Sequence, residues 1–79
     1  MLKLKYIISE NKNIIVFPET LNHSDFSHLK PTSAGFIYFA TNHEGEQICK
    51  CHGESTTLGL KSEPGDSELA IKQLIKNQF

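Results

Sequence analysis

The first part of the chain alternates hydrophobic and polar residues in the way typical of β-strands. Residues 2–8 carry an apolar side chain at every second position, the pattern of a strand with one buried face. The polar segment 10–13, which contains two asparagines, predicts a turn. Residues 14–17 are β-branched or aromatic and predict a second strand, which Pro18 ends. The two strands are expected to form a hairpin.

The segment after this hairpin is less regular and predicts a short helix over residues 24–29. Asn22 is a suitable N-cap, and the side chain of Asp25 can reach back to the start of the helix. Phe26 and Leu29 lie three positions apart, so a helix would bury them on one face. Pro31 forbids continuation of the helix beyond this point.

Three further strands are predicted in the middle of the chain. Residues 33–40 include four consecutive apolar side chains, which suits a central strand covered at least partly on both faces. A hairpin turn over 42–46, with Gly45 in the left-handed conformation, leads to a fourth strand over 47–51. Residues 55–60 predict a fifth.

A C-terminal helix is predicted from Ser67 to about Asn77, capped by Asp66 or Ser62. Its apolar residues recur four positions apart and form one stripe, in the pairs Ala70–Leu74, Ile71–Ile75 and Ile75–Phe79. A lone helix of this length is marginal in water, so the stripe is expected to pack on the sheet. The chain is therefore predicted to be one α+β domain over residues 1–79. It has an antiparallel sheet of about five strands, a short helix after the second strand and a C-terminal helix on one face.

Charge and composition narrow the classes of partner. Eight lysines and nine acidic residues give a formal charge of −1, and the chain has no arginine. Readers of nucleic-acid sequence depend on arginine and on a basic face, so the composition disfavours nucleic acid as a partner. No segment approaches the roughly 20 apolar residues that span a bilayer, which predicts no membrane association. The short apolar run at the N-terminus does not match an export signal, so the expected location is cytoplasmic.

Cys49, Cys51 and His52 resemble part of a metal site. On a strand the two cysteines point to one face and His52 to the other. A structural zinc site needs four ligands, and the spacing of His23 and His28 does not present a clean second pair. The cysteines are interpreted instead as small buried hydrophobic residues with reduced thiols. No metal ligand and no cofactor are therefore predicted.

Three stretches carry a resemblance to known sequences: 23–25 (His-Ser-Asp), 33–36 (Ser-Ala-Gly-Phe) and 51–66. With their Cys-x-Gly-Glu-Ser and Leu-Gly-Leu-Lys-Ser motifs, they are similar to a group of short, uncharacterised bacterial and phage-associated proteins. The match covers about half of the chain. It departs from the pattern at His52, where an aromatic residue is expected, and at Thr57, where serine is expected. The resemblance implies no activity.

The preferred functional hypothesis is a small non-enzymatic interaction module. The expected strand edges could accept another chain. A polar strip supplies the candidate binding residues, and no catalytic residue is assigned. The partner would be a protein, either a second copy in a homodimer or a larger complex to which this chain is an accessory subunit. The candidate binding residues are Ser24, Asp25, Glu54, Ser55 and Thr57.

Two alternatives stay open. The first is a small ligand-binding protein or enzyme in which Glu54, Ser55, His23 and Asp25 converge on one pocket. The second is a metal-linked or redox role for Cys49 and Cys51.

Overall fold

The computed structural model describes residues 3–76 and has the element order of an α+β protein. The predicted strand residue Leu2 and the predicted helical residues Asn77 and Phe79 lie outside this range. The elements are β1 (Leu4–Ser9), β2 (Ile14–Pro18), the 3₁₀ helix η1 (His23–Leu29), β3 (Pro31–Thr41), β4 (Gln47–His52), β5 (Glu54–Ser55), β6 (Leu60–Lys61), α1 (Asp66–Ala70) and the π-helical η2 (Ile71–Lys76).

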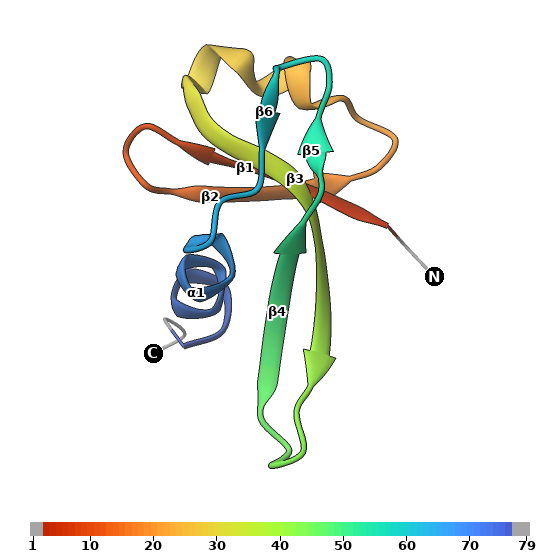
Figure 1. The fold of residues 1–79 in the computed structure, drawn as a ribbon, viewed down its shortest axis with the longest axis vertical. Helices are drawn as coiled ribbons and strands as arrows, with labels where there is room; N and C mark the ends of the chain where they lie inside the picture. Colours follow the sequence, from red (N-terminus) through yellow and green to blue (C-terminus); the bar gives the residue numbers. More distant parts are fainter. Residues whose placement is uncertain (1–2, 77–79) are drawn as a thin grey trace.

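The first four strands form one antiparallel sheet in the order β2-β1-β3-β4. The β1–β2 hairpin runs across the view in Figure 1, whereas β3 bends away from it and continues downward beside β4. β3 is an inner strand of the sheet, as its apolar run predicted. The α+β class and the antiparallel sheet are thus confirmed.

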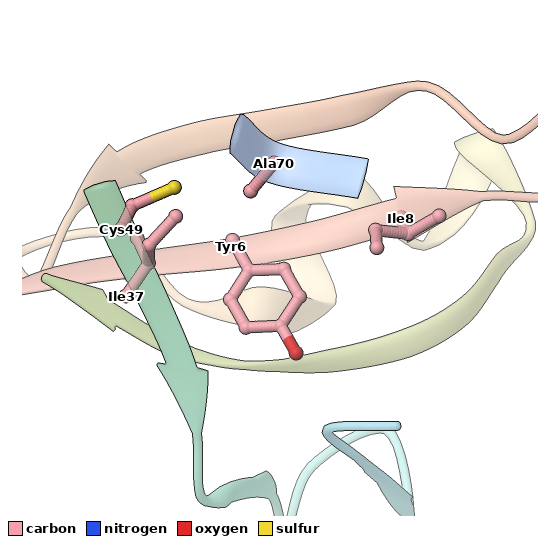
Figure 2. Packing of buried hydrophobic residues seen from close by; sticks show 5 residues of the cluster. All are labelled: Tyr6, Ile8, Ile37, Cys49 and Ala70. Carbon is pink, nitrogen blue, oxygen red and sulfur yellow. The ribbon is translucent and has the colours of Figure 1, made fainter. Parts of the chain in front are cut away.

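One face of the sheet is covered by the C-terminal helix. The buried residues there are Tyr6 and Ile8 of β1, Ile37 of β3, Cys49 of β4 and Ala70 of α1 (Figure 2). Further apolar residues of the predicted helical stripe pack around them, among them Leu74 and Ile75. The alternation in the first strand and the stripe in the last helix therefore meet, because each can bury its apolar side only against the other.

The opposite face is covered by η1 and by the short strands β5 and β6. Ile7, Phe17 and Ala34 are buried there, and Phe26 and Leu29 of η1 pack against them. The predicted short helix is confirmed, in 3₁₀ form, as is the role of Asp25, whose Oδ2 accepts a hydrogen bond from the Asn22 amide at 2.9 Å. The sheet thus has a cluster of buried residues on each side.

The predicted fifth strand over 55–60 is wrong. β5 and β6 are two residues each, pair with one another and form a second, separate sheet. Between them the chain reverses, because Oγ of Ser55 accepts a hydrogen bond from the Leu58 amide at 3.3 Å and Gly59 adopts a left-handed φ of 67°. Thr56 and Leu58 therefore lie in a tight turn and Leu60 begins β6, so the alternation of these residues does not mark a single strand.

The predicted cap of the C-terminal helix is also wrong. Gly65 is the N-cap, and Asp66 is the first helical residue. Oδ2 of Asp66 is occupied by the amide of Glu63 at 2.9 Å and by the hydroxyl of Tyr6 at 2.6 Å. Its carboxylate therefore joins the helix to the sheet.

None of the described helices has the length and the apolar character needed to cross a membrane.

Candidate functional site

Ser24 and Asp25 lie at the start of η1 and are exposed. The Asp25 carboxylate already accepts the Asn22 amide, so it has a structural role in starting the helix. Glu54 and Thr57 are exposed near the β5–β6 turn. The structure therefore places these four predicted binding residues on two elements that cover the same face of the sheet.

Ser55, the fifth predicted binding residue, is 2% exposed. Its hydroxyl accepts the Leu58 amide and lies 3.3 Å from the Thr57 hydroxyl. This hydroxyl stabilises the turn between β5 and β6, and Ser55 is too buried to contact a ligand on the surface.

His23 is one of the four residues of the alternative in which the chain is a ligand-binding protein or an enzyme. It is 5% exposed, and its Nε2 lies 2.8 Å from the carbonyl oxygen of Gly35. Its ring packs edge-on against Phe17 and Phe36, with centroid distances of 5.6 and 5.9 Å. The imidazole fixes η1 to β3, so the geometry does not favour a pocket built from His23, Asp25, Glu54 and Ser55.

Cys49 and Cys51 point to the same face of β4, as predicted, and neither forms a disulfide in the described part of the chain. His52 points to the other face, where its ring stacks on Phe36. Across residues 3–76, no three histidine, cysteine, aspartate or glutamate side chains gather closely enough to hold a metal ion. Cys49 and Cys51 instead pack in the core between the sheet and the C-terminal helix.

The electrostatic surroundings keep both thiols protonated. Burial raises the pKa of Cys49. Burial, followed by the nearby negative charge of Asp66, raises the pKa of Cys51 to about 11. Since the thiolate is the reactive form, neither cysteine has the lowered pKa that a redox or nucleophilic role requires.

We expect the native protein to resist alkylation. At pH 8, iodoacetamide should modify Cys51 at least tenfold more slowly than in the urea-unfolded chain, because a pKa near 11 leaves little thiolate. Asp66→Asn should speed the native reaction, since it removes a negative charge that opposes ionisation. Mass spectrometry of timed samples measures both rates, and equal rates in native and unfolded protein would contradict the expectation.

A buried polar network joins the sheet to the C-terminal helix. Tyr6 is completely buried, and its hydroxyl donates to the carboxylate of Asp66. Beside it, the amide of Cys51 donates to the hydroxyl of Ser67 at 2.9 Å. Burial, followed by the hydrogen bond to Asp66, raises the pKa of Tyr6. Sequence reasoning missed this network, since tyrosine and aspartate sixty positions apart give no local signal.

A cleft of about 420 Å³ opens beside this network, between the β1–β2 turn, the start of β3 and the beginning of α1. Ile8 and Leu69 supply apolar wall. Lys12, Ser33 and the carboxylates of Glu63 and Asp66 supply polar groups. None of the five predicted binding residues lines it.

A second feature is the uncovered part of the sheet at the β3–β4 hairpin, on the face opposite the C-terminal helix. Phe36 stacks on His52 with a centroid distance of 6.0 Å, and Tyr38 lies 5.8 Å from the same imidazole. Nζ of Lys3 lies 5.5 Å from the centre of the Phe36 ring. We call these four residues, Lys3, Phe36, Tyr38 and His52, the aromatic face.

Tyr38 is 49% exposed, and its neighbour Phe39, which points to the other side of the hairpin, is 47% exposed. The apolar run in β3 predicted a strand covered on both faces. That expectation is wrong for its second half, because the hairpin continues past η1 on one side and past the C-terminal helix on the other (Figure 1).

The edge of β4 is largely occupied. The Cys51 amide that bonds Ser67 points away from β3, so the alternate residues Cys49 and Gln47 point the same way. Cys49 is 1% exposed under the C-terminal helix, and Gln47 is the exposed outward position that remains. The expected open edge is thus reduced to the tip of the hairpin.

The other edge, β2, is also blocked in part. Oε1 of Gln73 accepts the outward amide of Ile14 at 2.9 Å, and its Nε2 donates to the carbonyl of Lys12 at 2.6 Å. Pro18, at the end of the strand, has no amide hydrogen to offer. Gln73 therefore uses both ends of its amide to cover the start of this edge.

The three stretches that carry the sequence resemblance meet in space. His23 bonds the carbonyl of Gly35, and a Cβ at Gly35 would lie 3.3 Å from the carbonyl oxygen of Gly53. The last of the stretches ends at Asp66, in the network with Tyr6. These residues hold η1, the segment after β4 and α1 against the main sheet. The residues of the motif therefore have a structural role in the fold. Comparison of the chain with protein-family models, with curated protein sequences and with solved structures finds no match.

Proposed function

We propose that this chain is a small protein-interaction module, not an enzyme, and that it docks through the aromatic face. The observation that supports the proposal most is the exposure of Tyr38 within a continuous set of ring contacts that reaches His52 and Phe36. Such rings supply a large contact area at a low cost in conformational entropy, and tyrosine is enriched among the residues that dominate binding energy.

The chemistry of the surroundings suggests what the partner presents. Lys3 and the exposed Lys50, which is paired with Tyr38 across the hairpin, place positive charge beside the rings. A matching protein surface would bring apolar or aromatic side chains at its centre and carboxylates at its rim. The partner is a second copy of the chain or a larger complex in which the chain is an accessory subunit.

The hairpin offers a matched pair of variants. Tyr38→Ala and Phe39→Ala each remove one exposed aromatic ring of nearly equal exposure, from opposite faces of the same strand. Tyr38→Ala is expected to weaken association at least tenfold, which corresponds to about 1.4 kcal/mol. Phe39→Ala should leave it nearly unchanged.

Sedimentation velocity over a range of concentrations measures self-association of the three proteins. Affinity capture from the native host, quantified by mass spectrometry, measures association with another protein. A monomer at every concentration, together with a set of captured proteins that Tyr38→Ala does not deplete, would contradict the proposal.

A further inference from the structure

The cleft beside α1 is lined by a polar side chain that can reach an occupant. Ser33 is 2% exposed and lines the cleft. Among residues 3–76 no buried side-chain oxygen or nitrogen lacks a hydrogen-bond partner, so the Ser33 hydroxyl, which makes no bond to these residues, is accessible in the cleft. An occupant of the cleft can therefore bond it.

Asp66 lines the same cleft and is 6% exposed. Its Oδ2 accepts both the Tyr6 hydroxyl and the Glu63 amide, so these two bonds fix the orientation of the carboxylate. The side chain of Glu63 adds a second carboxylate at the exposed rim. This end of the cleft is therefore suited to a cation that can donate several hydrogen bonds.

Lys12, whose side chain carries a positive charge, also lines the cleft. Lys12 lies in the β1–β2 turn, and Gln73 holds the carbonyl of this residue with a bond of 2.6 Å, which ties the turn to the C-terminal helix. Ile8 and Leu69 leave apolar wall among the polar groups. A ligand that matches all of these groups carries an ammonium group, a carboxylate and a short aliphatic part.

We propose that this cleft binds a small zwitterion of the α-amino-acid class. Its ammonium group would bond Asp66, Glu63 and the Ser33 hydroxyl, its carboxylate would pair with Lys12, and its side chain would contact Ile8 and Leu69. The volume of about 420 Å³ falls within the usual range for small-molecule sites. The site shares no residue with the aromatic face, so it is independent of the proposed docking function.

Three probes separate the charges of the ligand. Norvaline carries both charged groups, butylamine carries the ammonium group alone, and butyrate carries the carboxylate alone. In an NMR titration of the full chain, norvaline is expected to give saturable shifts at the amides of Ser33, Asp66 and Leu69. Butylamine should bind about tenfold more weakly, because it has no carboxylate to pair with Lys12. Butyrate should give no saturable shift, because it has no ammonium group for the carboxylates of Asp66 and Glu63.

Two variants test the assignment of the groups. Glu63→Gln should weaken norvaline binding severalfold, whereas Glu68→Gln, an exposed change on the same helix that lies outside the cleft, should not. Ser33→Ala should weaken binding about tenfold and leave thermal stability unchanged, because the hydroxyl has no partner within the described fold.

Three results would overturn the proposal. The first is the absence of saturable shifts with millimolar norvaline. The second is butyrate binding as strong as that of norvaline, which would reverse the assigned charges. The third is a loss of stability above about 1 kcal/mol in Ser33→Ala, since that would reveal an internal partner for the hydroxyl.

Discussion

Gly35→Ala is expected to lower the free energy of unfolding by about 3 kcal/mol, a large share of what a domain of this size has. A Cβ at this position would lie 2.5 Å from the carbonyl oxygen of His52 and 3.3 Å from that of Gly53. Both atoms belong to the backbone, so no side chain can rotate away to relieve the overlap. The chain between β4 and β5 would have to move off β3, and the bond from His23 to the Gly35 carbonyl would weaken with it.

Gly65→Ala is the matched control. A Cβ there meets no atom within 4 Å, and the residue has a φ of −88°, which alanine adopts readily. The change should cost less than about 1 kcal/mol, most of it from the weaker N-cap. Urea unfolding followed by circular dichroism measures both variants. Equal stabilities of the two would show that β3 and the segment after β4 are not in close contact.

Tyr6→Phe is expected to lower the free energy of unfolding by about 2 kcal/mol at neutral pH. The ring remains, so the packing seen in Figure 2 is kept, and the whole effect comes from the hydroxyl that donates to Asp66. Without it a buried carboxylate keeps only the Glu63 amide on Oδ2. Tyr38→Phe removes the hydroxyl of an exposed tyrosine and should have no effect on stability.

The same hydroxyl gives the fold a dependence on alkaline pH. The pKa of Tyr6 is raised in the folded state, whereas in the unfolded chain it is about 10. Below pH 10 both states keep the proton, and stability is constant with respect to this group. Above pH 10 the unfolded chain loses the proton first, so stability falls by about 1.4 kcal/mol per pH unit.

Tyr6→Phe should therefore flatten the decline above pH 10, while Tyr38→Phe should keep the slope of the parent protein. Urea unfolding at a series of pH values measures the slopes. A slope in Tyr6→Phe as steep as in the parent would mean that Tyr6 does not ionise on unfolding in this range.

The parts of the fold that could be predicted are those with a local periodic signal. The alternation in β1 and the four-residue spacing in the C-terminal helix each identify a buried side, and both sides meet in one core. The turn at Gly45 was also correctly predicted, since its φ of 80° needs glycine. In the turn after β1, by contrast, it is Lys12 and not an asparagine that takes a positive φ.

The wrong predictions concern features that depend on contacts between residues far apart in sequence, or on where the elements that cover the sheet end. The alternation over 55–60 is the same in a strand and in this turn, and the turn is set by the bond from the Leu58 amide to Ser55 and by the left-handed φ of Gly59. The apolar run in β3 says nothing about where η1 and the C-terminal helix stop, which is what exposes Tyr38 and Phe39. The cleft depends on Lys12, Ser33 and Asp66, which are far apart in sequence. No spacing rule connects them.

Gln73 has a consequence for the stoichiometry of any assembly. A sheet with two open sides can recruit copies without limit and grow into a fibre. Here the side chain of Gln73 and the absence of an amide hydrogen in Pro18 obstruct growth at β2, and on β4 only the region around Gln47 is left exposed. Strand addition at β2 is thereby disfavoured, which favours closed pairs formed through β4 over open polymers.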